Sequence, residues 1–96
     1  MGVTVCYRRV APNGEMSGLH DLEVGWRSMF RELLDDHCLL GINTEADIPA
    51  LERLAVDQHK GQRQPPFDWC EDIHAACHIL ISEIKQHGAI QVEALY

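Results

Sequence analysis

The hydrophobic positions between residues 69 and 87 recur with the period of a helix. At 100° per residue they gather on one face, and they are Trp69, Ile73, Ala76, Cys77, Leu80 and Ile84. Asp68 is a suitable N-cap residue, and Glu71 three positions later can complete a capping box. Lys85 and Gly88 supply the matching C-terminal signals. The pattern predicts a helix over 69–87.

Two other stretches alternate with a period of two, which is typical of half-buried strands. In residues 3–10, Val3, Val5 and Tyr7 share one face, while Thr4, Cys6 and Arg8 share the other. In residues 89–96, Ile90, Val92, Ala94 and Tyr96 share one face. The alternation predicts one strand at each end of the chain.

The middle of the chain has weaker helical patterns. An apolar stripe predicts a helix over 18–40 that ends at Gly41, and a thinner stripe predicts a short helix over 48–59. Asn43–Asp47 is predicted to be a turn, and 60–66 a loop rich in Gly and Pro. Gly25 is unfavourable inside a helix, so the helix could instead start near residue 26. The alternative for Met16–Gly25 is a strand, although the segment lacks a convincing alternating pattern.

These elements predict a single α+β domain over residues 1–96, in the order β-α-α-α-β. We expect the first and last strands to pair as a small antiparallel sheet that packs on the helices. A two-stranded sheet leaves both edges unpaired, so the same ribbon of a second molecule can extend it. The sequence therefore favours a homodimer. The alternative is a monomer in which Met16–Gly25 supplies a third strand.

Composition and charge narrow the class of protein. Of the 96 residues, 46% are hydrophobic and 24% charged, which is ordinary for a folded domain. The net charge of −7 opposes non-specific nucleic-acid binding, which needs Lys and Arg against phosphates. No run approaches the roughly 18 apolar residues of a membrane span, and the N-terminus lacks a secretory signal pattern. We expect a soluble, cytoplasmic, acidic protein.

Cysteine and histidine provide the main chemical candidates. The four cysteines at 6, 38, 70 and 77 are expected to be reduced thiols. Cys70, His74 and His78 follow one another at four-residue spacing, which suits a soft transition metal such as zinc. One helix rarely supplies a whole tetrahedral set, so another segment would have to contribute. A catalytic Cys70 thiolate is less favoured, because nearby carboxylates oppose it.

Aromatic residues suggest a second kind of site. Four of them could line a pocket for a small apolar or cationic ligand: Tyr7, Trp26, Phe30 and Trp69. The simpler interpretation is that they belong to the core. The sequence as a whole favours a non-enzymatic module that binds a protein or small molecule, with no cofactor. The alternatives are a zinc-binding protein and, third, a thiol-dependent enzyme.

Overall fold

The computed structural model describes residues 4–22, 24, 27–60 and 69–95, with side chains throughout except at 27–28, 57–60 and 69–72. The strands are β1 (Thr4–Val10), β2 (Met16–Leu22), β3 (Gly41–Thr44) and β4 (Ala89–Leu95). The helices are α1 (Arg27–Asp36), α2 (Ile48–Lys60) and α3 (Trp69–His87), with a 3-10 turn, η1 (Glu45–Asp47), before α2.

The four strands form one antiparallel sheet in the order β2-β1-β4-β3. The predicted pairing of the first strand with the last is confirmed, with a register that runs from Thr4↔Leu95 to Arg9↔Ile90. The predicted order β-α-α-α-β is wrong, because β2 and β3 add two strands and the observed order is β-β-α-β-α-α-β. Both edges of the β1–β4 ribbon are therefore paired within the same chain.

The N-terminal part of the predicted 18–40 helix is wrong. This segment forms strand β2, as the strand alternative predicted. Val5 pairs with Leu22 and Tyr7 with His20, but Arg9 pairs with Ser17. Two residues of β2 thus oppose Arg8 alone, which is a β-bulge. The bulge includes Gly18, whose φ of 68° favours glycine. Because a bulge shifts the alternation by one residue, the period of two was not visible in the sequence.

The C-terminal end of the predicted 18–40 helix is also wrong. The helix ends at Asp36 rather than near Leu40. The Leu39 N–H donates to the Leu34 carbonyl oxygen at 2.7 Å, and the Cys38 N–H to that of Asp35 at 3.0 Å. This is a Schellman motif. Its left-handed position is usually Gly but here is Cys38, with φ 57°, so the sequence carried no stop signal.

The segment after α1 was predicted to turn at Asn43–Asp47 and instead pairs Gly41–Thr44 with β4 as strand β3. Asn43 is buried, and its side-chain amide donates to the Leu39 carbonyl oxygen at 2.8 Å. The remainder, Glu45–Asp47, forms the η1 turn. The predicted short helix is confirmed as α2.

Helix α3 confirms the predicted helix at both ends. Its apolar face is buried as expected, with Ile73, Cys77, Leu80 and Ile84 all within the core. After the last turn the Gly88 N–H donates to the Ile84 carbonyl oxygen at 2.7 Å, with Gly88 at φ 92°. The proposed N-cap, Asp68, and the predicted 60–66 loop beyond residue 60 lie outside the described residues.

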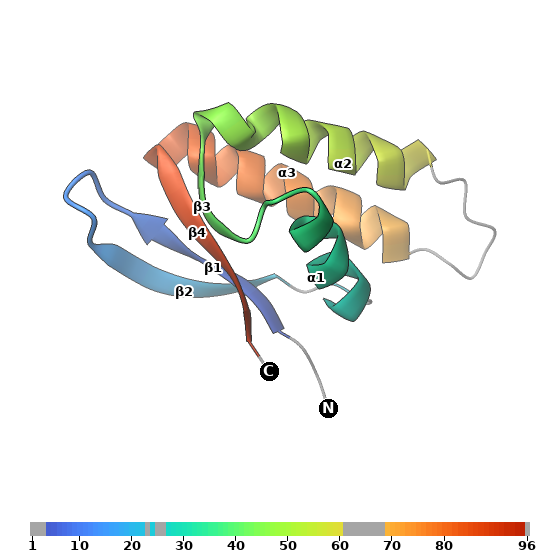
Figure 1. Ribbon diagram of the computed structural model, residues 1–96, viewed down its shortest axis with the longest axis horizontal. Helices are drawn as coiled ribbons and strands as arrows, with labels where there is room; N and C mark the ends of the chain where they lie inside the picture. The colour runs from blue at the N-terminus through green and yellow to red at the C-terminus, as the bar shows by residue number, and fades with distance from the viewer. Residues whose placement is uncertain (1–3, 23, 25–26, 61–68, 96) are drawn as a thin grey trace.

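The helices cover one face of the sheet. In Figure 1, α2 and α3 run side by side above the strands, and the β1–β2 hairpin extends beyond them. One core cluster joins Val5, Tyr7, Ile90 and Val92 of the sheet to buried residues of all three α-helices. The residues that alternate with them on the sheet are absent from this cluster. Within the described ranges, no helix is both long and apolar enough to cross a bilayer.

Candidate functional site

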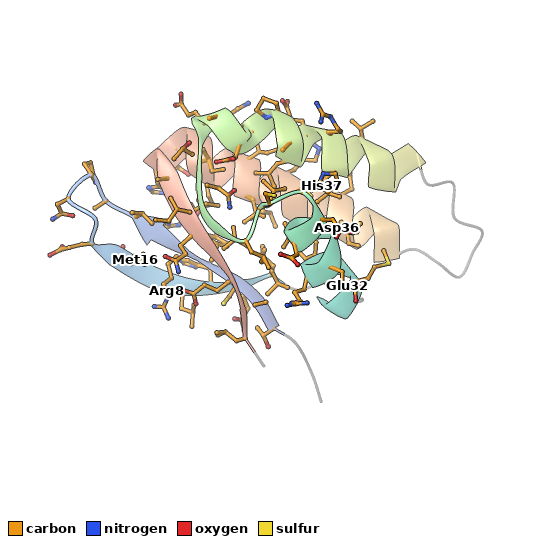
Figure 2. The ribbon with its side chains drawn as sticks, in the orientation of Figure 1. Arg8, Met16, Glu32, Asp36 and His37 are labelled. Carbon is orange, nitrogen blue, oxygen red and sulfur yellow. The ribbon has the colours of Figure 1, made fainter. Side chains whose placement is uncertain are left out.

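The sheet has a second face that no described helix covers, and we call it the outer face. Strand pairing defines its rows: Cys6 lies opposite Asp21 on β2 and Glu93 on β4. Arg8 lies opposite Gln91, which in turn lies opposite Ile42 on β3. Figure 2 labels Arg8 and Met16 on the part of the sheet that lies away from α2 and α3.

Large apolar side chains are exposed at the margins of the outer face. Leu19 on β2 is 47% exposed and Ile42 on β3 is 58% exposed. Leu95 on β4, opposite Thr4, and Met16, opposite Val10, are also exposed. Each of these side chains leaves apolar area in water that a partner could cover.

A polar network lies between them. The Arg8 Nε donates to Glu93 Oε1 at 3.2 Å, and the Gln91 side-chain amide donates to the same oxygen at 3.1 Å. The Cys6 thiol in the same row is fully buried. Burial raises its pKa, as do the charges of Glu93 and Asp21, while Arg8 acts in the opposite direction. Cys6 is therefore held as a neutral thiol.

On the inner face, a buried carboxylate connects α3 to β1. Both Nε and Nη2 of Arg9 lie 2.9 Å from Glu83 Oε1, and the His87 Nε2 lies 3.7 Å from Oε2. The Tyr7 hydroxyl also donates to this carboxylate. Burial acts to raise the pKa of Glu83, but the hydrogen bonds from Tyr7 and Arg9 and the charges of Arg9 and His87 outweigh it, so the pKa is lowered. We call these four residues the Glu83 network.

The Glu83 network is poorly suited to acid–base catalysis. Burial, followed by the hydrogen bond to Glu83 and its charge, raises the pKa of Tyr7. Tyr7 is therefore held neutral and Glu83 ionised, whereas a general acid or base works best with a pKa near neutrality. The arrangement stabilises the contact between the last turns of α3 and strand β1.

His20 lies beside this network on the inner face of β2. Its ring stacks on Tyr7, with ring centroids 5.1 Å apart and planes inclined by 23°. Its Nε2 atom is buried and makes no hydrogen bond within the described part of the chain. A Cβ atom at Gly18 would lie only 2.8 Å from this nitrogen. The bulge glycine therefore provides the space for the ring.

The predicted aromatic set is only partly described. Tyr7 and Phe30 are buried members of the core, in line with the simpler of the two interpretations. Trp26 and the side chain of Trp69 lie outside the described residues. A ligand pocket formed by the four residues stays a prediction.

The predicted metal set is also partly described. His74 and His78 lie together on α3, with ring centroids 4.5 Å apart, whereas the side chain of Cys70 lies outside the described residues. Where side chains are described, no three His, Cys, Asp or Glu residues are grouped as metal ligands would be. Cys6, Cys38 and Cys77 are free thiols, as predicted, and burial raises the pKa of Cys77 to about 12.

The Glu83 network was missed at the sequence level, although one signal was present. Glu83 follows Ala76 by seven residues and Leu80 by three, so it occupies the apolar face of the helix. A charged residue on such a face indicates a buried partner. Arg9 has no comparable signal, because only strand pairing orients it toward α3.

Comparison with protein-family models finds no match, and comparisons with curated proteins and with solved structures find no significant match either. Function is therefore inferred from the geometry of the chain alone.

Proposed function

We propose that this protein is a non-enzymatic interaction module that works as a homodimer, with a second copy bound to the outer face of the sheet. The observation that carries the proposal is the exposure of Leu19, Ile42 and Leu95 on a face that no described helix covers. Large apolar side chains on an open sheet face are stabilised when a partner removes them from water.

The outer face is favoured over the strand edges as the site of contact. The β1–β4 ribbon has no free edge, since β2 and β3 pair with it. The edges that remain are unsuitable: β2 carries the bulge at Gly18, and β3 is only four residues long. Bulges and short edge strands are the devices by which proteins discourage edge-to-edge pairing.

The charges on the outer face are compatible with a second copy as the partner, although the net charge of the chain opposes self-association. The chain has a net charge of −7, so two copies repel each other through most of their surfaces. The outer face differs, because Arg8 lies among Asp21, Gln91 and Glu93. A two-fold axis through this face can place Arg8 of each copy against carboxylates of the other, since a two-fold interface uses the same patch on both copies.

The area of the outer face limits the expected affinity between two copies. Strand β4 has seven residues, so four strands at normal spacing span about 23 by 19 Å, or about 440 Å² in flat projection. A standard stable interface buries about 800 Å² of accessible surface per partner. A corrugated face has more accessible area than its projection, but the contact remains at the low end of the range. We therefore expect a weak, concentration-dependent dimer.

The pKa directions agree with a non-enzymatic role. Cys77 has its pKa raised to about 12, and the pKa of Tyr7 is raised while that of Glu83 is lowered. At neutral pH a thiol and a phenol are already mostly protonated and a carboxylate is already mostly ionised, and each shift in pKa strengthens that state. Catalytic groups are usually shifted toward neutrality instead.

Sedimentation equilibrium over a range of protein concentrations tests the proposal. Leu19→Asp places a charge at the outer face and should weaken the dimer at least about tenfold, which corresponds to about 1.4 kcal/mol. Ile79→Asp is the matched control, because Ile79 on α3 has the same 47% exposure as Leu19 but lies in the helical layer. A protein that stays monomeric at millimolar concentration, or equal effects of the two substitutions, would contradict the proposal.

A further inference from the structure

The tip of the β1–β2 hairpin is an exposed turn that contains an Asn-Gly pair. The Gly14 N–H donates to the carbonyl oxygen of Ala11 at 2.8 Å, and the Ala11 N–H donates to that of Glu15 at 2.8 Å. Gly14 has a positive φ of 88°, so a β-turn followed by a G1 bulge connects the two strands. Residues 11–15 are all exposed, and in Figure 1 the tip lies beyond the helices.

The side chain of Asn13 is held along the main chain of this turn. Its Oδ1 accepts a hydrogen bond from the Glu15 N–H at 3.0 Å, which makes an Asx-turn. The bond curls the side chain toward the residues that follow it. The amide carbon Cγ of Asn13 therefore faces the segment that contains the backbone nitrogen of Gly14.

This arrangement supplies the groups of an intramolecular acyl transfer. Cγ of Asn13 is the electrophile and the Gly14 nitrogen is the nucleophile, and one turn holds both of them. The Glu15 N–H donates to Oδ1, the oxygen on which negative charge develops during attack, as a donor of an oxyanion hole does. Nothing beyond its chain neighbours lies within 4 Å of the position that a Gly14 Cβ would take, so the nucleophile is not crowded.

We infer that Asn13 is a self-modification site, at which the Gly14 nitrogen converts the asparagine to a cyclic imide and then to Asp or isoaspartate. The nitrogen gives its proton to hydroxide and bonds to Cγ. The bond from Cγ to Nδ2 breaks, and Nδ2 takes a proton from water and leaves as ammonia, which regenerates hydroxide. One water then opens the imide. Cleavage of the bond from Cγ to nitrogen gives Asp, and cleavage of the backbone C–N bond gives isoaspartate.

One hydrogen bond opposes the reaction. The Gly14 N–H must leave the Ala11 carbonyl oxygen before its nitrogen can attack, and a hydrogen bond of ordinary net strength slows such a step by about 2- to 13-fold. The Glu15 N–H acts in the opposite direction. An oxyanion donor contributes a factor of about 10²–10³ in a buried active site and much less in an exposed turn, where water screens it. The folded chain should therefore react within about tenfold of the rate of an unstructured peptide.

The two products differ in their effect on the hairpin. Asp keeps the path of the main chain and an oxygen that accepts from the Glu15 N–H. Isoaspartate routes the main chain through Cβ and Cγ, which adds a methylene group inside a turn closed by two bonds of 2.8 Å. Isoaspartate should therefore open the turn, and the inference does not depend on the proposed dimer, because the turn contains none of the apolar side chains assigned to that contact.

The chain contains an internal control, because Asn43 is the only other asparagine in the sequence. Asn43 is 1% exposed and lies in strand β3. Its side-chain amide donates to the Leu39 carbonyl oxygen at 2.8 Å, and the next residue is Thr44, whose branched side chain crowds the backbone nitrogen. We expect no reaction at Asn43 in the folded chain.

Incubation of the purified protein at mildly alkaline pH and physiological temperature tests the inference, with peptide mapping by mass spectrometry at intervals. Exchange of the amide NH2 for OH changes the mass of the peptide, and electron-transfer fragmentation distinguishes isoaspartate from Asp. We expect both products at residue 13 and neither at residue 43. The rate should rise with pH, because the Gly14 nitrogen must lose its proton.

Two glycine variants and a synthetic peptide of residues 9–17 separate the geometry of the turn from its sequence. Gly14→Ala crowds the nucleophile and should slow the reaction at Asn13 at least about tenfold. Gly88→Ala is the matched control, because Gly88 also has a positive φ, of 92°, and open space; the rate at Asn13 should stay within about twofold of the parent. No conversion at Asn13, equal rates at Asn13 and Asn43, an unchanged rate in Gly14→Ala, or a folded chain more than about tenfold slower than the peptide would overturn the inference.

Discussion

The Glu83 network should be the strongest single electrostatic contribution to the stability of this fold. The perturbation is a double-mutant cycle of Glu83→Gln and Arg9→Ala. The Glu83 side chain is 11% exposed and accepts two contacts of 2.9 Å from Arg9. Hydrogen bonds to charged groups contribute about 1.5–3 kcal/mol when buried, but the Arg9 side chain is 38% exposed, and solvent screening reduces the value.

Because Glu83 is buried but Arg9 is partly screened by solvent, we expect a coupling energy of about 2 kcal/mol between Arg9 and Glu83. For a domain of this size, a loss of 2 kcal/mol lowers the melting temperature by about 8–16 °C. Urea denaturation of the parent, both single variants and the double variant at neutral pH measures the coupling. Glu93→Gln with Arg8→Ala is the matched control, because Arg8–Glu93 has one contact of 3.2 Å and the Glu93 side chain is 21% exposed, against 11% for Glu83. Its coupling should stay below about 1 kcal/mol.

The same network predicts a pH dependence. The pKa of Glu83 is lower in the folded chain than its ordinary value. The ionised carboxylate therefore adds stability that is fully present above the unfolded-state pKa, which is about 4.3 for Glu, and is lost as the pH falls through the folded-state pKa. Glu83→Gln should flatten the decline of stability below about pH 4.3. Equal coupling in the two cycles, or an unchanged acid limb in Glu83→Gln, would refute the reasoning.

Two further predictions concern backbone geometry, and both are checked by chemical denaturation. Gly18→Ala should cost about 2 kcal/mol or more, because a positive φ costs about 1–2 kcal/mol and the new Cβ would meet His20 at 2.8 Å. Gly14→Ala should cost only about 1 kcal/mol, because Gly14 also has a positive φ of 88° but no atom lies within 4 Å of the new Cβ. In a His20→Ala background, where the clash is removed, Gly18→Ala should cost about as much as Gly14→Ala. Cys38→Gly should stabilise the fold by about 0.5–1 kcal/mol by relieving φ 57° at the end of α1; a destabilised variant would show that the thiol makes a contact worth more than the strain.

Some features of this protein were predictable from its sequence. Helix α3 was predicted at both ends, and β1 and β4 were recognised by alternation and paired correctly. Their signals are local: a 3.6-residue apolar period, a stop at Gly88 and a two-residue period. The predicted candidate site was less complete, since only the contact of His74 with His78 is described.

Tertiary structure decided the rest. The alternation of β2 is broken by a bulge that exists only because β1 pairs beside it. Strand β3 is four residues long and pairs only with β4 among the described strands. Helix α1 ends at Asp36, and Cys38 beyond it adopts a left-handed conformation that glycine usually occupies. In each case a non-local contact outweighs a weak local preference.

The candidate surfaces also depend partly on local sequence patterns and partly on tertiary contacts. The alternation of β1 and β4 determined which of their residues share a face, but only the packing of all three helices on the opposite side left Leu19 and Ile42 exposed together. Arg9 meets Glu83 because β1 and the end of α3 cross, although 74 positions separate them in the chain. Local sequence determines the period and the ends of an element, whereas the choice of neighbours depends on contacts between distant residues, which leave no local pattern.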